Sequence, residues 1–193
     1  MIKTKQLAYA LVLAMGGTSS VAQSATLDEI IITATKTAAS LQDVPVAVNV
    51  LSAEDIREAG INDAYDVATH TPSLTVTSNS SPFNTKLSVR GIGTVQNDPA
   101  LEPSVGMFVD GVFLGRSGLG TSDLTDIERI EVLQGPQGTL YGKNTNAGLI
   151  SVITKKPNLE EFEGYVEISA GNYDMRKLTL TGSGPLSDTV AYR

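Results

Sequence analysis

Glycine-rich segments are the first place to look for chemistry in this chain, because glycine turns can cradle phosphate groups. The phosphate-loop pattern requires glycine five residues before Gly142, but Gln137 stands there, and Asn144 replaces the required Ser or Thr. A dinucleotide-binding turn at Gly91-Ile92-Gly93 also fails. Gln96 replaces its third glycine, and Asp98-Pro99 is incompatible with the helix that should follow. The sequence therefore argues against a nucleotide enzyme.

Few other residues could support catalysis or metal binding. His70 is the only histidine and cysteine is absent, so we expect no catalytic residue, metal site or cofactor. The 21 acidic residues outnumber the 14 basic ones, for a net charge of −7. That balance argues against a nucleic-acid partner, which would favour a basic surface.

The glycines at positions 135, 138, 142 and 148 lie between two apolar runs. Ile130 and Val132 alternate with Arg129 and Glu131 before them, and residues 149–153 form a second apolar run. Pro157 and the lysines before it end that run. We expect two strands joined by a compact, glycine-rich connection.

Residues 126–157 resemble the end of the plug domain of TonB-dependent outer-membrane receptors, whose motif is IERIEVLxGPxGxLYGxxxxGGxINxITKxP. Ala147 and Ser151 replace the Gly and Asn that the family commonly has. The resemblance implies an α+β plug with a small mixed sheet, short helices and glycine-rich loops. It also implies energy-coupled uptake of a scarce ligand, most commonly a ferric siderophore. Apical plug loops in this family touch the ligand, which makes Phe83, Asn84, Gln96 and Asn97 candidate contacts.

The plug itself is expected over residues 45–157. Val46, Val48 and Val50 alternate with polar or small residues and predict a strand. Ser52 with Asp55, and Asn62 further on, are the expected N-caps of two short helices. Asp110-Gly111 between apolar pairs predicts a hairpin.

An extended, β-prone segment follows the N-terminal region and reads Asp28-Glu29-Ile30-Ile31-Ile32-Thr33-Ala34-Thr35. It could be an ordinary first strand, but it also resembles the TonB box, which we place at residues 27–35 ahead of a linker at 36–44. A TonB box would bind the TonB energy transducer by strand addition, pairing its backbone with the edge of the partner's sheet.

The first 22 residues have the features of a signal peptide. Lys3 and Lys5 precede a short apolar run that is followed by small residues, with cleavage expected after Ala22 or, as an alternative, Ala25. We expect export and a location in the outer membrane.

From residue 162 to 193 the chain alternates apolar and polar residues in runs of the length of a transmembrane β-strand. Family resemblance implies a barrel of about 22 strands, so these residues are expected to be its first strands and the chain an N-terminal portion. The alternative is a freestanding periplasmic ligand-binding module that has the plug fold but does not transport.

Overall fold

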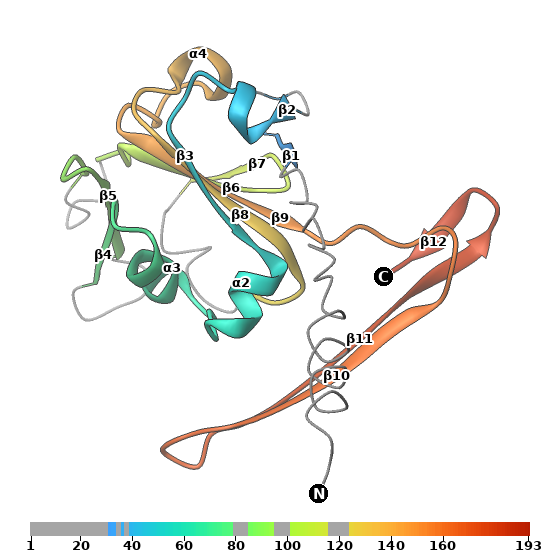
Figure 1. Cartoon of the computed structure of the whole chain (residues 1–193). Coiled ribbons are helices and arrows are strands. Elements are labelled where there is room, and N and C mark those ends of the chain that lie inside the picture. Colours follow the sequence, from blue (N-terminus) through green and yellow to red (C-terminus); the bar gives the residue numbers. More distant parts are fainter. Residues whose placement is uncertain (1–30, 34–35, 37–38, 79–84, 95–100, 116–123) are drawn as a thin grey trace, which may run out of the picture.

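The computed structural model describes residues 31–33, 36, 39–78, 85–94, 101–115 and 124–193. At its centre is a five-stranded mixed sheet in the order β3–β8–β9–β6–β7 (Figure 1). The strands are β3 (Val48–Ser52), β8 (Ile127–Gln134), β9 (Gly148–Thr154), β6 (Val105–Val109) and β7 (Val112–Leu114). Neighbouring strands are antiparallel except β6 and β9, which are parallel. The expected α+β fold with a small mixed sheet is confirmed.

The glycine-rich stretch forms the centre of this sheet. β8 and β9 pair antiparallel, with Leu133 opposite Leu149. Their connection contains the short helix α4 (Gly138–Tyr141) and is closed by main-chain hydrogen bonds, including one of 2.9 Å from the Gln137 amide to the Thr145 carbonyl. The connection is compact, as the sequence predicts, and it places β8 beside β9.

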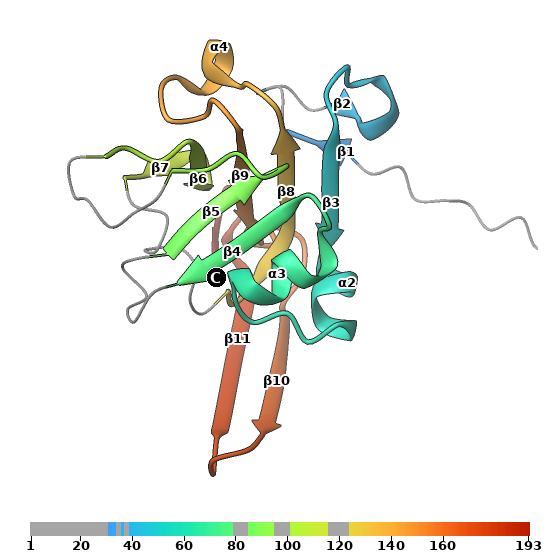
Figure 2. The same ribbon diagram turned by 90° about the vertical axis from the view of Figure 1, so that its left-hand side faces the viewer.

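One face of the sheet carries the main hydrophobic core. Ile130 and Val132 point toward this face, which is covered by two short helices and a hairpin (Figure 2). These are α2 (Ala53–Glu58), α3 (Ala64–His70), β4 (Leu74–Ser78) and β5 (Thr85–Val89), with β4 and β5 antiparallel. Burial of these apolar side chains is the main force holding the layers together.

The opposite face has a smaller core made by Phe108, Leu133 and Leu149. Ile32 packs into it from the N-terminal segment and is fully buried. That segment contains β1 (Ile31–Ile32), β2 (Ala39–Ser40) and the 3-10 helix η1 (Leu41–Asp43). The sheet is therefore covered on both sides, and the second cover comes from residues of the predicted TonB box and of the predicted linker 36–44.

Local sequence signals account for the helix starts. Ser52 caps α2 in a reciprocal capping box with Asp55, as predicted. The predicted cap at Asn62 is wrong by one residue, because Asp63 caps α3 and accepts from the amides of Tyr65 and Asp66. An aspartate carboxylate is an equally good cap acceptor as an asparagine amide, so composition alone could not choose between them.

The predicted hairpin at Asp110-Gly111 is the turn between β6 and β7. Both residues have positive φ, 48° and 80°, as a two-residue hairpin turn requires. The Asp110 carboxylate also accepts hydrogen bonds from the amide and hydroxyl of Thr154, at 2.9 and 2.8 Å. This contact fixes the turn against the end of β9.

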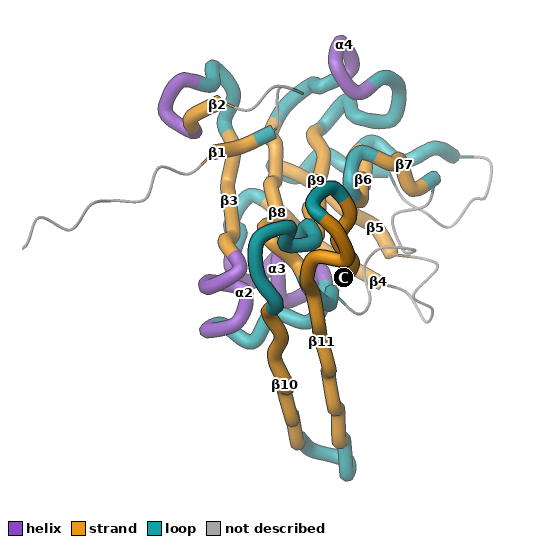
Figure 3. Tube along the Cα trace, turned by 90° about the vertical axis from the view of Figure 1, so that its right-hand side faces the viewer, coloured by secondary structure: helices purple, strands orange, loops and turns teal. Residues whose placement is uncertain are grey.

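Beyond the plug lies a separate three-stranded antiparallel sheet, β10–β11–β12. The strands are β10 (Glu163–Ala170), β11 (Arg176–Ser187) and β12 (Val190–Tyr192). β10 and β11 form a long hairpin that projects from the plug (Figures 1 and 3). Val166, Ile168, Leu178 and Leu180 lie exposed on it.

Among the described residues, no helix is long and apolar enough to cross a membrane.

Candidate functional site

The part of the predicted TonB box that the structure describes is Ile31–Thr33. Ile31 and Ile32 form β1 and pair antiparallel with Ser40 and Ala39 of β2. The other predicted residues of the box, Asp28, Glu29, Ile30, Ala34 and Thr35, lie outside the described residues. The described part is extended, as strand addition requires, and it is docked on the plug.

Thr33 is bound to the plug through two side chains of β8. Its backbone N–H donates to Glu131 Oε1 at 3.0 Å, and its hydroxyl lies 3.4 Å from the same oxygen. Arg129 Nε donates to that oxygen at 2.8 Å, while Arg129 Nη2 donates to the Thr33 hydroxyl at 3.2 Å. Glu131, Arg129 and Thr33 thus form one polar cluster, which we call the Thr33 cluster.

Glu131 is unusual because its carboxylate, on the interior strand β8, is fully buried, with 0% of its surface exposed. Sequence reasoning missed it, since alternation with Ile130 and Val132 only places Glu131 on the other face of the strand. That face is covered by the N-terminal segment, 98 residues away in sequence. In the sequence, only the position of Glu131 within the plug motif could have pointed to it. That Thr33 is its partner follows only from the fold.

Tyr141 of α4 borders the Thr33 cluster. Its hydroxyl donates to the Thr33 carbonyl at 3.5 Å, and its ring contacts that of Phe108 with centroids 5.0 Å apart. Lys36 Nζ lies 5.2 Å from the centre of the Tyr141 ring, within the range of a cation–π interaction. Burial raises the pKa of Tyr141, and the nearby negative charge of Glu131 raises it further. Tyr141 therefore stays protonated and remains a hydrogen-bond donor to the segment.

The predicted ligand contacts Phe83, Asn84, Gln96 and Asn97 all lie outside the described residues. Near one of their loops, the hydroxyls of Thr94 and Ser104 are 2.5 Å apart and share a hydrogen bond. The four contacts stay predictions.

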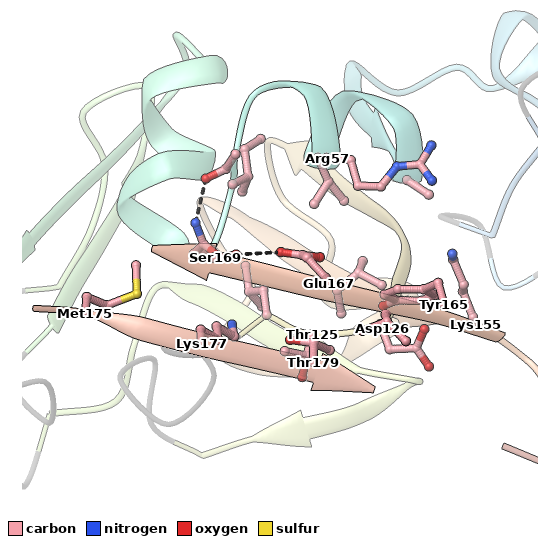
Figure 4. A pocket seen from close by; sticks show the side chains of 18 residues that line it. Arg57, Thr125, Asp126, Lys155, Tyr165, Glu167, Ser169, Met175, Lys177 and Thr179 are labelled. Atoms are coloured by element: carbon pink, nitrogen blue, oxygen red, sulfur yellow. Dashed lines mark hydrogen bonds between the residues drawn. The ribbon is translucent and has the colours of Figure 1, made fainter. Parts of the chain in front are cut away.

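A cavity of about 630 Å³ lies where the plug meets the hairpin β10–β11 (Figure 4). The plug contributes α2 with Arg57, the segment 124–127 and Lys155, and the hairpin contributes its polar face together with Val166 and Met175. Glu167 and Lys177 point into this space from adjacent strands (Figure 4). The polar face of the hairpin thus lies toward the plug.

The described residues contain no cluster of His, Asp and Glu side chains that could hold a metal ion. His70 lies at the end of α3, with its Nδ1 3.0 Å from the Asp66 carbonyl oxygen. This contact ties the ring to its own helix.

Comparison with known proteins places the chain in a family. Residues 40–149 match the family model of the TonB-dependent receptor plug domain. This is more than half of the chain, and the chain belongs to that family. The family is one of receptors and is not an enzyme class.

Two of the curated relatives are bacterial receptors. The pesticin receptor of Yersinia pestis is 31% identical over 177 residues, covering 89% of this chain and 25% of its own length. The ferripyoverdine receptor of Pseudomonas aeruginosa is 32% identical over 163 residues, covering 82% of this chain and 19% of its own length. The chain spans about a quarter or less of these relatives.

Solved structures agree with the sequence relatives. The ferric yersiniabactin uptake receptor of Yersinia pestis matches 74% of this chain and 22% of its own, with a TM-score of 0.68 and 31% identity. The ferripyoverdine receptor of the outer membrane of Pseudomonas aeruginosa, bound to ferripyoverdine, matches 83% of this chain and 21% of its own, with a TM-score of 0.69 and 28% identity. The shared fold is that of the plug.

Proposed function

We propose that this chain is the plug and the first wall strands of an outer-membrane receptor that imports a ferric siderophore. The observation that carries this proposal is the match to the plug family together with relatives named as ferripyoverdine and ferric yersiniabactin uptake receptors. In this role the plug occludes a barrel, the segment 27–35 couples to TonB, and the first 22 residues direct export. Phe83, Asn84, Gln96 and Asn97 are the proposed ligand contacts.

The hairpin β10–β11 supports a membrane role over the freestanding periplasmic module. Ile168 is 80% exposed, and Val166, Leu178 and Leu180 are also exposed. The strand register pairs Val166 with Leu180 and Ile168 with Leu178, which places all four on one side of the hairpin. Paired residues such as Ile168 and Leu178 reinforce this apolar side across the strands. An exposed apolar band marks an interaction surface, and its alternation with a polar face is the pattern of a barrel wall that lies against lipid.

Coupling by strand addition depends on backbone hydrogen bonds, so its test uses proline. Ile31→Pro and Thr33→Pro each remove a donor N–H and fix φ, which disables pairing with a partner strand. Ile31→Val keeps both the N–H and the β-propensity and serves as the matched control.

The experiment measures surface binding and uptake on the same cells, in a receptor that carries this chain ahead of its barrel. The ligands are yersiniabactin and pyoverdine loaded with radioactive iron, the siderophores named for the relatives. We expect the proline variants to bind one of these at the cell surface without importing it, and Ile31→Val to do both. Normal import by both proline variants would rule out a coupling role for this segment.

A further inference from the structure

The backbone N–H of Thr33 already has a hydrogen-bond acceptor while residues 31–33 are docked on the plug. It donates to Glu131 Oε1 at 3.0 Å, and the other strong donor to that oxygen is Arg129 Nε at 2.8 Å. A hydrogen bond to a charged acceptor is roughly twice as strong as one between neutral groups. An incoming strand would offer only a neutral carbonyl in its place.

Burial makes Glu131 depend on this donor. The side chain is fully enclosed, and its second oxygen, Oε2, has no hydrogen-bond partner among the described residues. A buried carboxylate is costly unless donors compensate for the lost water. Oε2 already lacks a donor among the described residues. If Thr33 moves away, Oε1 loses one of the donors that offset the cost of burying the carboxylate.

We propose that Glu131 competes with the strand-addition partner for the backbone N–H of Thr33, and so sets how available the coupling segment is. The inference rests on the proposed function, because it needs the segment 27–35 to be the coupling segment. Glu131 acts here as a positioning residue: it holds the segment on β8 and need not touch the partner. Ile32, buried in the small core beside it, keeps the Thr33 amide aimed at the carboxylate.

The ion pairs of Arg129 provide a control that separates the proposed role of Glu131 from a general effect of charge. Its guanidinium also pairs with Glu128, which neighbours it on β8 and has no hydrogen bond to Thr33. Glu128→Gln removes the same charge from the same arginine but leaves the Thr33 amide bonded. It is the matched control for Glu131→Gln.

The first measurement is site-resolved amide hydrogen exchange on the 193-residue chain. Glu131→Gln keeps the shape of the side chain but loses its charge, so we expect exchange at Thr33 to rise about tenfold. Glu128→Gln should leave it unchanged. Exchange at Ile150, in the sheet core, reports whether the variant is folded. If Glu131→Gln loses protection there, Glu131→Asp decides the test, since it retains the charge but withdraws the carboxylate from Thr33.

The second measurement is binding of the same variants to the purified soluble domain of a TonB protein. We expect Glu131→Gln to bind about tenfold more tightly than the parent chain, and Glu128→Gln to bind like the parent. Unchanged Thr33 exchange, or equal affinities of Glu131→Gln and parent, would overturn the role of Glu131 and leave the coupling function standing. Absence of binding by every variant would instead overturn the coupling function on which the inference rests.

Discussion

Arg193 donates two hydrogen bonds to the carboxylate of Asp126, joining the residue after β12 to the residue that precedes β8. Nη2 lies 2.6 Å from Oδ1, and Nε contacts Oδ2. The same guanidinium donates to Glu163 at the start of β10, at 2.9 Å. A single side chain therefore connects the plug to both outer strands of the β10–β11–β12 sheet.

This junction should weaken in acid. The hydrogen bonds from Arg193, more than its charge, hold the pKa of Asp126 below the ordinary value for aspartate. A lowered carboxyl pKa stabilises the folded state above the unfolded pKa, and that stability is lost as pH falls through the folded pKa. We expect amide exchange at the start of β10 to accelerate as pH falls below about 4, after correction for intrinsic exchange.

Asp126→Asn should abolish this acid step, the rise in amide exchange at the start of β10 at low pH. At neutral pH the substitution should lower the free energy of unfolding by less than about 1 kcal/mol, because the ion pair is partly solvated. Glu102→Gln is the control. Glu102 also has a lowered pKa, caused by its hydrogen bond from Lys143, but it lies on the plug away from the hairpin. An acid step at β10 that persists in Asp126→Asn would contradict this account.

Gly148, the first residue of β9, should not tolerate a side chain. Its φ of 151° lies in the region that favours glycine, and an added Cβ would collide with the carbonyl oxygen of Leu133 on the paired strand. We expect Gly148→Ala to lower the free energy of unfolding by about 2–3 kcal/mol in denaturant titration. Gly138→Ala is the control, because a Cβ there meets nothing within 4 Å; it should be neutral or slightly stabilising.

The apolar band of the hairpin should govern association with lipid. Ile168 is on the exposed band, and Ser169 beside it lines the cavity on the opposite face. A lysine on the lipid side of a transmembrane strand costs up to about 2–4 kcal/mol near the bilayer centre. In co-sedimentation with phosphatidylcholine vesicles, Ile168→Lys should lower the bound fraction severalfold, and Ser169→Lys should not. Equal losses in the two variants would mean that this band does not contact lipid.

Much of the plug could be predicted because its signals are local. The Asp110-Gly111 turn and the Ser52–Asp55 capping box each depend on residues at most three positions apart. The Thr33 cluster could not be predicted in this way. Alternation on β8 places Glu131 on one face but cannot say what covers that face, and its cover is nearly a hundred residues distant in sequence.

Two substitutions in the small core beneath the N-terminal segment should distinguish local opening of that segment from unfolding of the whole plug. Ile32 and Leu133 are both fully buried in it, but Ile32 belongs to a two-residue strand and Leu133 to β8, an eight-residue strand inside the five-stranded sheet. Truncating either removes similar apolar contacts, worth about 2–5 kcal/mol. Segments with few other contacts open independently of the whole fold. Ile32→Ala should therefore accelerate exchange at Thr33 more than tenfold with little change in the denaturant midpoint, whereas Leu133→Ala should lower the midpoint itself.

If Ile32→Ala lowered the midpoint as much as Leu133→Ala, the segment would be an integral part of the plug, and strand addition would require the whole domain to open.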